Sequence, residues 1–385
     1  MGEATSHRSA PRKQNFEHLD MLRGLAALLV LIGHVRGFVF LDYPQLTGSK
    51  LLAAPLYIIG GLGHQAVMLF FALSGFLVGG RALREIRSGA WNLPDYAVHR
   101  FARLWTALIP ALLATALLDW VGRDLLHLTG YGGEYFTMLS SGPQPDGPST
   151  DTLAAFFGNI AFLQGIAVTV FGTNGPLWSL SNEFWYYFLV PFAWTALAGR
   201  RLAISARLAA GGTAVFILLW LPGVVIVLGC IWVAGAIAWV VSATAMHRPE
   251  RGFGWSAAAI SIAVLAAGIG SMAWPGIVSD LALGIACAAA LPCLARVANP
   301  GGLYGRVAFG VSEISFTLYV VHFPLIALVW CALVAPHQFA PAIAGFAVAA
   351  GLIAIALVFA VTMWWLFERN TPHVRRWLLK TLRIG

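Results

Sequence analysis

The chain has 385 residues, of which 59% are hydrophobic and only 10% are charged, and its formal net charge is +8. A soluble domain carries about 25% charged residues, so this composition excludes an ordinary soluble enzyme and predicts an all-α fold, a polytopic bundle of transmembrane helices. Basic loops that contact anionic membrane lipid account for the positive charge, and we expect no nucleic-acid partner.

About ten stretches are long and apolar enough to be predicted as membrane spans. A span needs about 20 mostly apolar residues. The predicted spans are 19–40, 64–82, 101–119, 183–199, 207–222, 224–242, 256–273, 278–297, 312–334 and 342–367. A further apolar stretch, 152–171, is interrupted by glycine and polar residues. We expect it to be a re-entrant or interfacial element inside the long loop 120–182.

Basic residues gather on one side of the predicted spans. They cluster before the first span and in the segments 81–103, 200–207 and 369–383. By the positive-inside rule, both termini are then cytoplasmic and the long loop lies outside. We therefore expect a multi-pass protein of the inner (plasma) membrane, with a cytoplasmic tail at 1–18, a transmembrane domain at 19–370 and a basic cytoplasmic tail at 371–385.

The first span carries a cation at its mouth and an imidazole deep inside it. Arg23 and His34 are eleven residues apart, or three turns plus about 20°, so they share one helix face and lie about 16 Å apart along the axis. An ionisable group at this depth is costly and predicts a functional site. A histidine that only bonds a neighbouring helix is the alternative. An imidazole can take a proton from a hydroxyl group and return it to a leaving thiolate.

The ninth span carries Ser315, Tyr319 and His322 at spacings of four and three, so these polar groups line one helix face. Hydrogen bonds between helices are one explanation, and a cavity near His34 is the other. In the second span, Ser74 and Gly75 would allow close approach of a neighbouring helix, such as the first span.

Arg100 and Arg103 lie at the start of the third span. Contact with lipid headgroups is the ordinary role of such arginines. A phosphate clamp is the alternative, because a guanidinium group binds phosphate oxygens in a bidentate manner.

The entrance of the fourth span is dense in polar and aromatic groups, namely Trp178, Ser181, Glu183, Trp185 and Tyr187. An interfacial aromatic belt with a carboxylate at a helix N-terminus is one explanation. The other is a rim that binds an acceptor, because aromatic rings stack on sugar faces and a carboxylate accepts hydrogen bonds from hydroxyl groups.

Six dispersed motifs occur in one order along the chain. They are LDMLRGLAALLVLIGH at 19–34, FFALSGFL at 70–77, RFARL at 100–104, WSLSNE at 178–183, SFTLYVVH at 315–322 and FER at 367–369. Together they resemble the membrane-bound acyltransferase-3 family, whose members O-acylate surface polysaccharides, lipopolysaccharide, nodulation factors and macrolides. The resemblance covers about 16–370, and it is to the stand-alone members, which have no C-terminal esterase-like domain.

This resemblance implies an O-acyltransferase that uses acyl-CoA, most commonly acetyl-CoA, as co-substrate and has no bound cofactor or metal. Its acceptor would be a glycan, a lipid-linked sugar or a macrolide-like molecule. The candidate catalytic residues are Arg23, His34 and Glu183, and Arg23, Arg100 and Arg103 would bind the donor. His34 would act as general base or as a transient acyl carrier.

The acceptor or the cavity walls would be contacted by polar and aromatic groups of the fourth and ninth spans. These are Trp178, Ser181, Trp185, Tyr187, Ser315, Tyr319 and His322. The family often has a second acidic residue after WSLS and one intervening position, where this chain has Phe184. The alternative function is a secondary transporter or proton-coupled permease, since buried His and Arg also serve transport. The sequence shows no two-fold repeat of the kind that transporters often carry.

Overall fold

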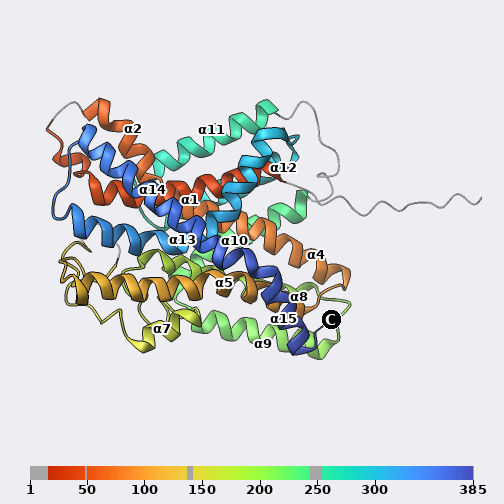
Figure 1. Cartoon of the computed structure of the whole chain (residues 1–385). Helices are drawn as coiled ribbons and strands as arrows, with labels where there is room; N and C mark the ends of the chain where they lie inside the picture. The colour runs from red at the N-terminus through yellow and green to blue at the C-terminus, as the bar shows by residue number, and fades with distance from the viewer. Residues whose placement is uncertain (1–15, 48–49, 137–141, 243–253, 385) are drawn as a thin grey trace, which may run out of the picture.

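A computed structural model describes residues 16–47, 50–136, 142–242 and 254–384 (Figure 1). Most of the predicted N-terminal tail, residues 1–15, lies outside the described residues. The predicted C-terminal tail forms a helix, α15 (Thr371–Leu382). The described residues form a bundle of helices that run along a common direction, and the all-α prediction is confirmed.

The first half of the bundle contains the helices that supply most of the polar groups discussed below. They are α1 (Glu17–Val39), α2 (Lys50–Gly61), α3 (Gly63–Ser74), α4 (Gly80–Ser88), α5 (Leu93–Trp120), α7 (Leu153–Ile160) and α8 (Trp178–Ala198). The second half is more uniformly apolar. Its helices are α9 (Ile204–Trp220), α10 (Gly223–Ser242), α11 (Gly254–Ser271), α12 (Ile277–Arg296), α13 (Gly302–Leu333) and α14 (Ile343–Leu366).

Each of the ten predicted spans coincides with a helix or helical run of the described chain. By length and composition, 7 of these are able to cross a membrane. Of the other three, α9 and α11 are apolar but shorter, and α8 has the length of a span, with 21 residues, but is not among the 7. The second span differs most from prediction, because α2, α3, a π-helical turn at 75–79 and α4 form one run from Lys50 to Ser88. The stretch 152–171 contains only α7, whose 8 residues are too short to cross.

Small residues allow the helices to pack closely. A Cβ atom on Gly24 of α1 would overlap Val311 of α13, and one on Gly75 would overlap the backbone of Trp232 in α10. The close approach predicted at Ser74 and Gly75 therefore exists, and the helix that approaches Gly75 is α10, not α1. Such contacts are typical of helices in membranes, where packing drives association.

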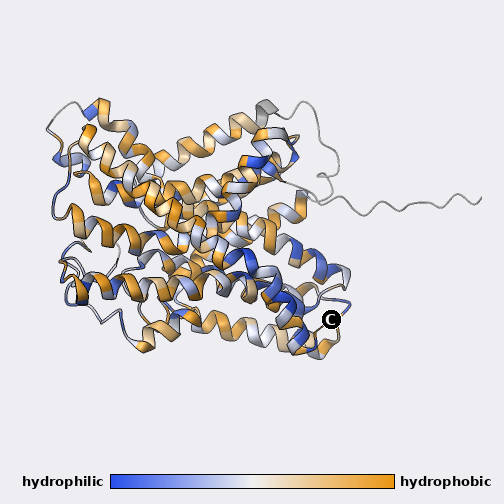
Figure 2. Ribbon diagram, in the orientation of Figure 1, coloured by the Kyte–Doolittle hydropathy of each residue, from blue (hydrophilic) through white to orange (hydrophobic). Residues whose placement is uncertain are grey.

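The outside of the bundle is strongly apolar. Leu51, Leu219 and Ile343 are 82%, 84% and 89% exposed, which suits a lipid environment and would be a liability in water. Figure 2 shows hydrophilic residues gathered where α4 and α15 lie. The start of α1 and the C-terminus both lie at this end of the bundle (right in Figure 1), as an even number of crossings requires. The chain is thus a membrane protein.

Candidate active site

Two neighbouring cavities lie between α1, α3, α8 and α13. The loop cavity, of about 710 Å³, is lined by the second half of α1, the start of α3 and the loop that precedes α8. The arginine cavity, of about 180 Å³, is lined by the start of α1, the end of α3, and parts of α5, α8 and α13. Val67 and Tyr319 line both.

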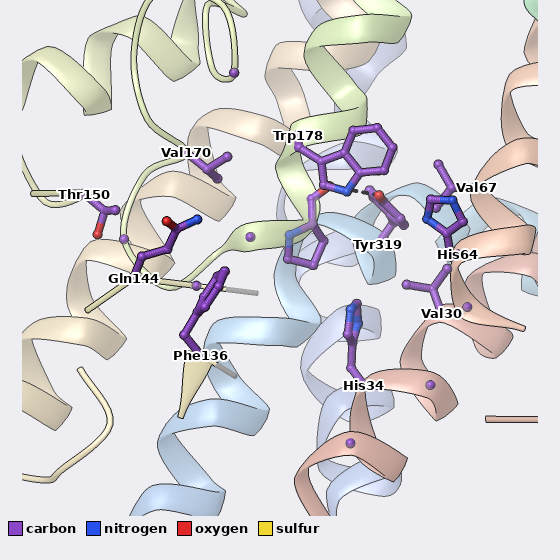
Figure 3. Close-up of a pocket in the computed structure, with 18 of the residues that line it drawn as sticks. Val30, His34, His64, Val67, Phe136, Gln144, Thr150, Val170, Trp178 and Tyr319 are labelled. Carbon is purple, nitrogen blue, oxygen red and sulfur yellow. Dashed lines mark hydrogen bonds between the residues drawn. The ribbon is translucent and has the colours of Figure 1, made fainter. Parts of the chain in front are cut away.

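His34 lines the loop cavity, and Figure 3 shows its ring pointing into the space below Tyr319. His34 Nδ1 lies 2.8 Å from Nε2 of His322, and the two rings stack with centroids 5.1 Å apart. The His34 and Phe323 rings also meet edge to face, with centroids 4.9 Å apart. The structure thus brings together the two histidines that the sequence places in different spans, and His34 both bonds a neighbouring helix and reaches a cavity.

The hydrogen bonds of this pair fix the protonation of each ring nitrogen. His322 is fully buried, and its Nδ1 lies 2.9 Å from the carbonyl oxygen of Leu318. A carbonyl group only accepts, so Nδ1 of His322 carries its proton and Nε2 of the neutral ring is the acceptor. His34 therefore donates from Nδ1 to His322. In the neutral pair this leaves Nε2 of His34 with a free lone pair.

Arg23, Arg100 and Arg103 all line the arginine cavity. Arg23 donates to Ser312 Oγ at 3.1 Å and lies 3.9 Å from Asp20. The three arginines that are predicted to bind the acyl donor thus come from two helices, α1 and α5, and meet in one cavity. Their combined positive charge favours an anionic ligand.

Each of the two arginines of α5 is held differently. Arg103 forms an ion pair with the buried Glu368, which also accepts hydrogen bonds from Thr317. Arg100 lies over the rings of Tyr96 and Tyr187, at 5.6 Å from each centroid. Cation–π contacts of this kind hold a guanidinium group without using its hydrogen-bond donors. The donors of Arg100 therefore stay available to a ligand more than those of Arg103.

Glu183 and Tyr187 line the arginine cavity and not a rim with Trp178, so their placement differs from the prediction. The Tyr187 hydroxyl donates to the Glu183 carboxylate at 2.5 Å. The reason is that α8 already begins at Trp178. Five further residues turn Glu183 by about 140° from Trp178 and move it about 7.5 Å along the axis.

Ser181 and Trp185 hold the preceding loop against α8. Ser181 is fully buried and donates to the carbonyl oxygen of Gln164 at 2.8 Å. The Trp185 indole donates to the carbonyl oxygen of Phe162 at 3.0 Å. Of Trp178, Ser181 and Trp185, only Trp178 is among the described residues that line the loop cavity. Ser181 and Trp185 shape the loop cavity only through the loop.

Tyr319 and Ser315 line the cavities from α13. Ser315 lines the arginine cavity. The Tyr319 hydroxyl donates to the carbonyl oxygen of Pro176 at 2.9 Å and accepts from Ser179, whose Oγ is 2.6 Å away. Pro176 lies just before α8, and Ser179 lies in its first turn. These bonds fix the tyrosine ring between the two cavities.

His64 is a residue of the loop cavity that was missed from the sequence. Its Nε2 lies 2.9 Å from Asp280 of α12, and its ring stacks near Trp178 with centroids 6.4 Å apart. His64 is the first residue of the predicted second span, so the depth that singles out His34 is absent here. The loop of this cavity is fixed by Asp119, which accepts from Thr173 at 2.7 and 2.8 Å.

The comparisons with known proteins place the chain in a family. Residues 16–365 match the model of a family described as an acyltransferase domain. The chain is also similar to an "O-acetyl transferase" of Shigella phage Sf6, with 27% identity over 181 residues, which are 45% of this chain and 44% of the relative. The match thus spans under half of that protein. No solved structure gives a significant match.

Proposed function

The chain belongs to the acyltransferase-3 family. We propose that it transfers an acyl group, preferably acetyl, from acyl-CoA to a hydroxyl group of an acceptor. The observation that supports this most directly is the His34–His322 pair, which leaves an imidazole lone pair in a cavity. A general base needs a free lone pair that a substrate hydroxyl group can reach. The similar phage protein is named for O-acetyl transfer.

The donor would be held in the arginine cavity. Guanidinium groups bind phosphate oxygens through paired hydrogen bonds, and coenzyme A carries phosphates at the end remote from its thioester. Arg23 and His34 lie about 16 Å apart along one helix face. An extended donor with its phosphates near Arg23, Arg100 and Arg103 would therefore direct its thioester toward His34.

The acceptor would occupy the loop cavity. Its volume of about 710 Å³ is within the range of small-molecule sites, about 300 to 1,000 Å³. Trp178 offers a ring on which a sugar can stack, and His64 with Asp280 offers polar partners for hydroxyl groups. We propose a glycan, a lipid-linked sugar or a macrolide-like molecule as the acceptor.

In the proposed step, Nε2 of His34 removes the proton of the acceptor hydroxyl while its oxygen attacks the thioester carbonyl carbon. The carbon–sulfur bond then breaks, and the imidazolium returns the proton to the thiolate of coenzyme A. The products are the acylated acceptor and free coenzyme A. His322 is a positioning residue, because its Nε2 holds Nδ1–H of His34 and so fixes the tautomer that can act as base.

The proposed reaction requires the arginine cavity to open toward the cytoplasm, where acyl-CoA is made. We therefore propose an inner-membrane protein with both termini cytoplasmic, as the positive-inside rule predicts. Fused after Gly385, green fluorescent protein is expected to fluoresce and alkaline phosphatase is expected to be inactive. The reverse pattern would place α15 and the arginine cavity outside and contradict a cytoplasmic donor.

The function is tested by incubating membranes that contain the protein with radiolabelled acetyl-CoA. We expect base-labile label in membrane or acceptor material, and none in matched membranes that lack the protein. Uptake of a labelled solute into sealed vesicles, without transfer of the acyl group, would instead support the transporter alternative.

A further inference from the structure

We propose that Val67 and Tyr319 form a gate, a narrow point of fixed shape between the two cavities, and limit the size of the acyl group that is transferred. This inference rests on the proposed function. Donor phosphates would lie in the arginine cavity, whereas the base lies in the loop cavity. The acyl end of the donor therefore has to pass the wall between them.

That wall consists of one side chain from each of two facing helices. Among the residues that the structure describes, Val67 of α3 and Tyr319 of α13 are the two that line both cavities. They are 5% and 7% exposed. Phe70, one turn after Val67, meets the Tyr319 ring edge to face with centroids 5.8 Å apart. The wall thus presents a valine and aromatic rings, and the Tyr319 hydroxyl is already bonded to Pro176 and Ser179.

Both sides of the gate are stiff. The Tyr319 hydroxyl is bonded to Pro176 and Ser179, so the ring cannot turn aside without breaking two hydrogen bonds. Valine is branched at Cβ and has one strongly preferred rotamer in a helix. The two methyl groups of Val67 therefore act as a fixed limit on the width of the passage. One extra methylene in a tight apolar site changes selectivity by about 10- to 200-fold.

The chain contains three valines that make a matched set. Val67 lines both cavities, Val78 lines only the arginine cavity, and Val170 lines only the loop cavity. The same substitution, Val→Ala, removes the same atoms at each place. A general loosening of the protein would affect all three variants, whereas a gate is sensitive only at position 67.

The test measures kcat/KM for transfer from acetyl-CoA and from propionyl-CoA in membranes, with base-labile label as the readout and the amount of folded protein checked by size-exclusion chromatography. Val67→Ala is expected to raise the propionyl-to-acetyl ratio by about tenfold or more. Val67→Ile, which adds one carbon, is expected to lower it. Val78→Ala and Val170→Ala are expected to keep the wild-type ratio.

The outcomes separate the two proposals. If the wild-type protein labels no acceptor from either donor, the proposed function is wrong and the gate is wrong with it. If the wild type transfers acetyl, but the ratio does not move in opposite directions in the two Val67 variants, the gate is excluded and the proposed function stands. An equal shift in Val78→Ala or Val170→Ala would also exclude the gate.

Discussion

Replacing His34 with alanine is expected to lower the rate of acyl transfer by about 10²- to 10⁴-fold, which is the contribution of a positioned general base. The substitution removes the lone pair of Nε2 from the loop cavity and leaves the arginine cavity intact, because His34 does not line it. Donor affinity and the amount of folded protein are therefore expected to stay at wild-type levels. Initial rates with radiolabelled acetyl-CoA and direct binding of acetyl-CoA to solubilised protein measure the two quantities separately.

The hydrogen bond between His34 and His322 makes a second variant informative. His322→Ala removes the acceptor of the His34 Nδ1–H bond, so a smaller loss of rate than that of His34→Ala is expected. In the wild type, transfer is expected to rise with pH as the imidazole loses its proton, and His34→Ala is expected to lose this dependence. His373→Ala, on the exposed surface of α15, is the matched control. A folded His34→Ala protein that acylates at a near-normal rate would remove His34 from the mechanism and make His322 the next candidate.

The features that the sequence predicts are those that depend on a single helix. Apolar stretches locate spans because the bilayer requires them, whatever their neighbours are. The shared face of Arg23 and His34 follows from helical geometry alone. The same reasoning could not find the bond between His34 and His322, since 288 residues separate them. Nor could it show that Arg23 and His34 line different cavities.

The placement of Glu183 and Tyr187 differs from the predicted outer rim for an identifiable physical reason. The sequence predicts a fourth span that begins at residue 183. The helix begins five residues earlier, so both side chains reach the arginine cavity. The two cavities themselves depend on how α3 and α13 face each other, and neither hydropathy nor periodicity contains that information.

The second large effect is expected at Arg23. Arg23→Ala should weaken acetyl-CoA binding by about 10- to 100-fold, because hydrogen bonds to charged groups contribute about 1.5–3 kcal/mol each. The rate at saturating donor should fall much less, since the His34–His322 pair lies in the other cavity. Lysine at position 23 is not expected to restore binding, because a point charge cannot reproduce the two parallel hydrogen bonds of a guanidinium group.

Arg36 provides the matched control for Arg23. It lies on the same helix but lines the loop cavity, where it pairs with Asp42 at 3.1 Å. Arg36→Ala is therefore expected to leave acetyl-CoA affinity unchanged, and size-exclusion chromatography separates a loss of binding from a failure to insert or fold. If Arg36→Ala weakened donor binding and Arg23→Ala did not, the donor would occupy the loop cavity. Acyl-CoA would then have to approach from the opposite side of the bundle, and the proposed orientation of the protein would be wrong.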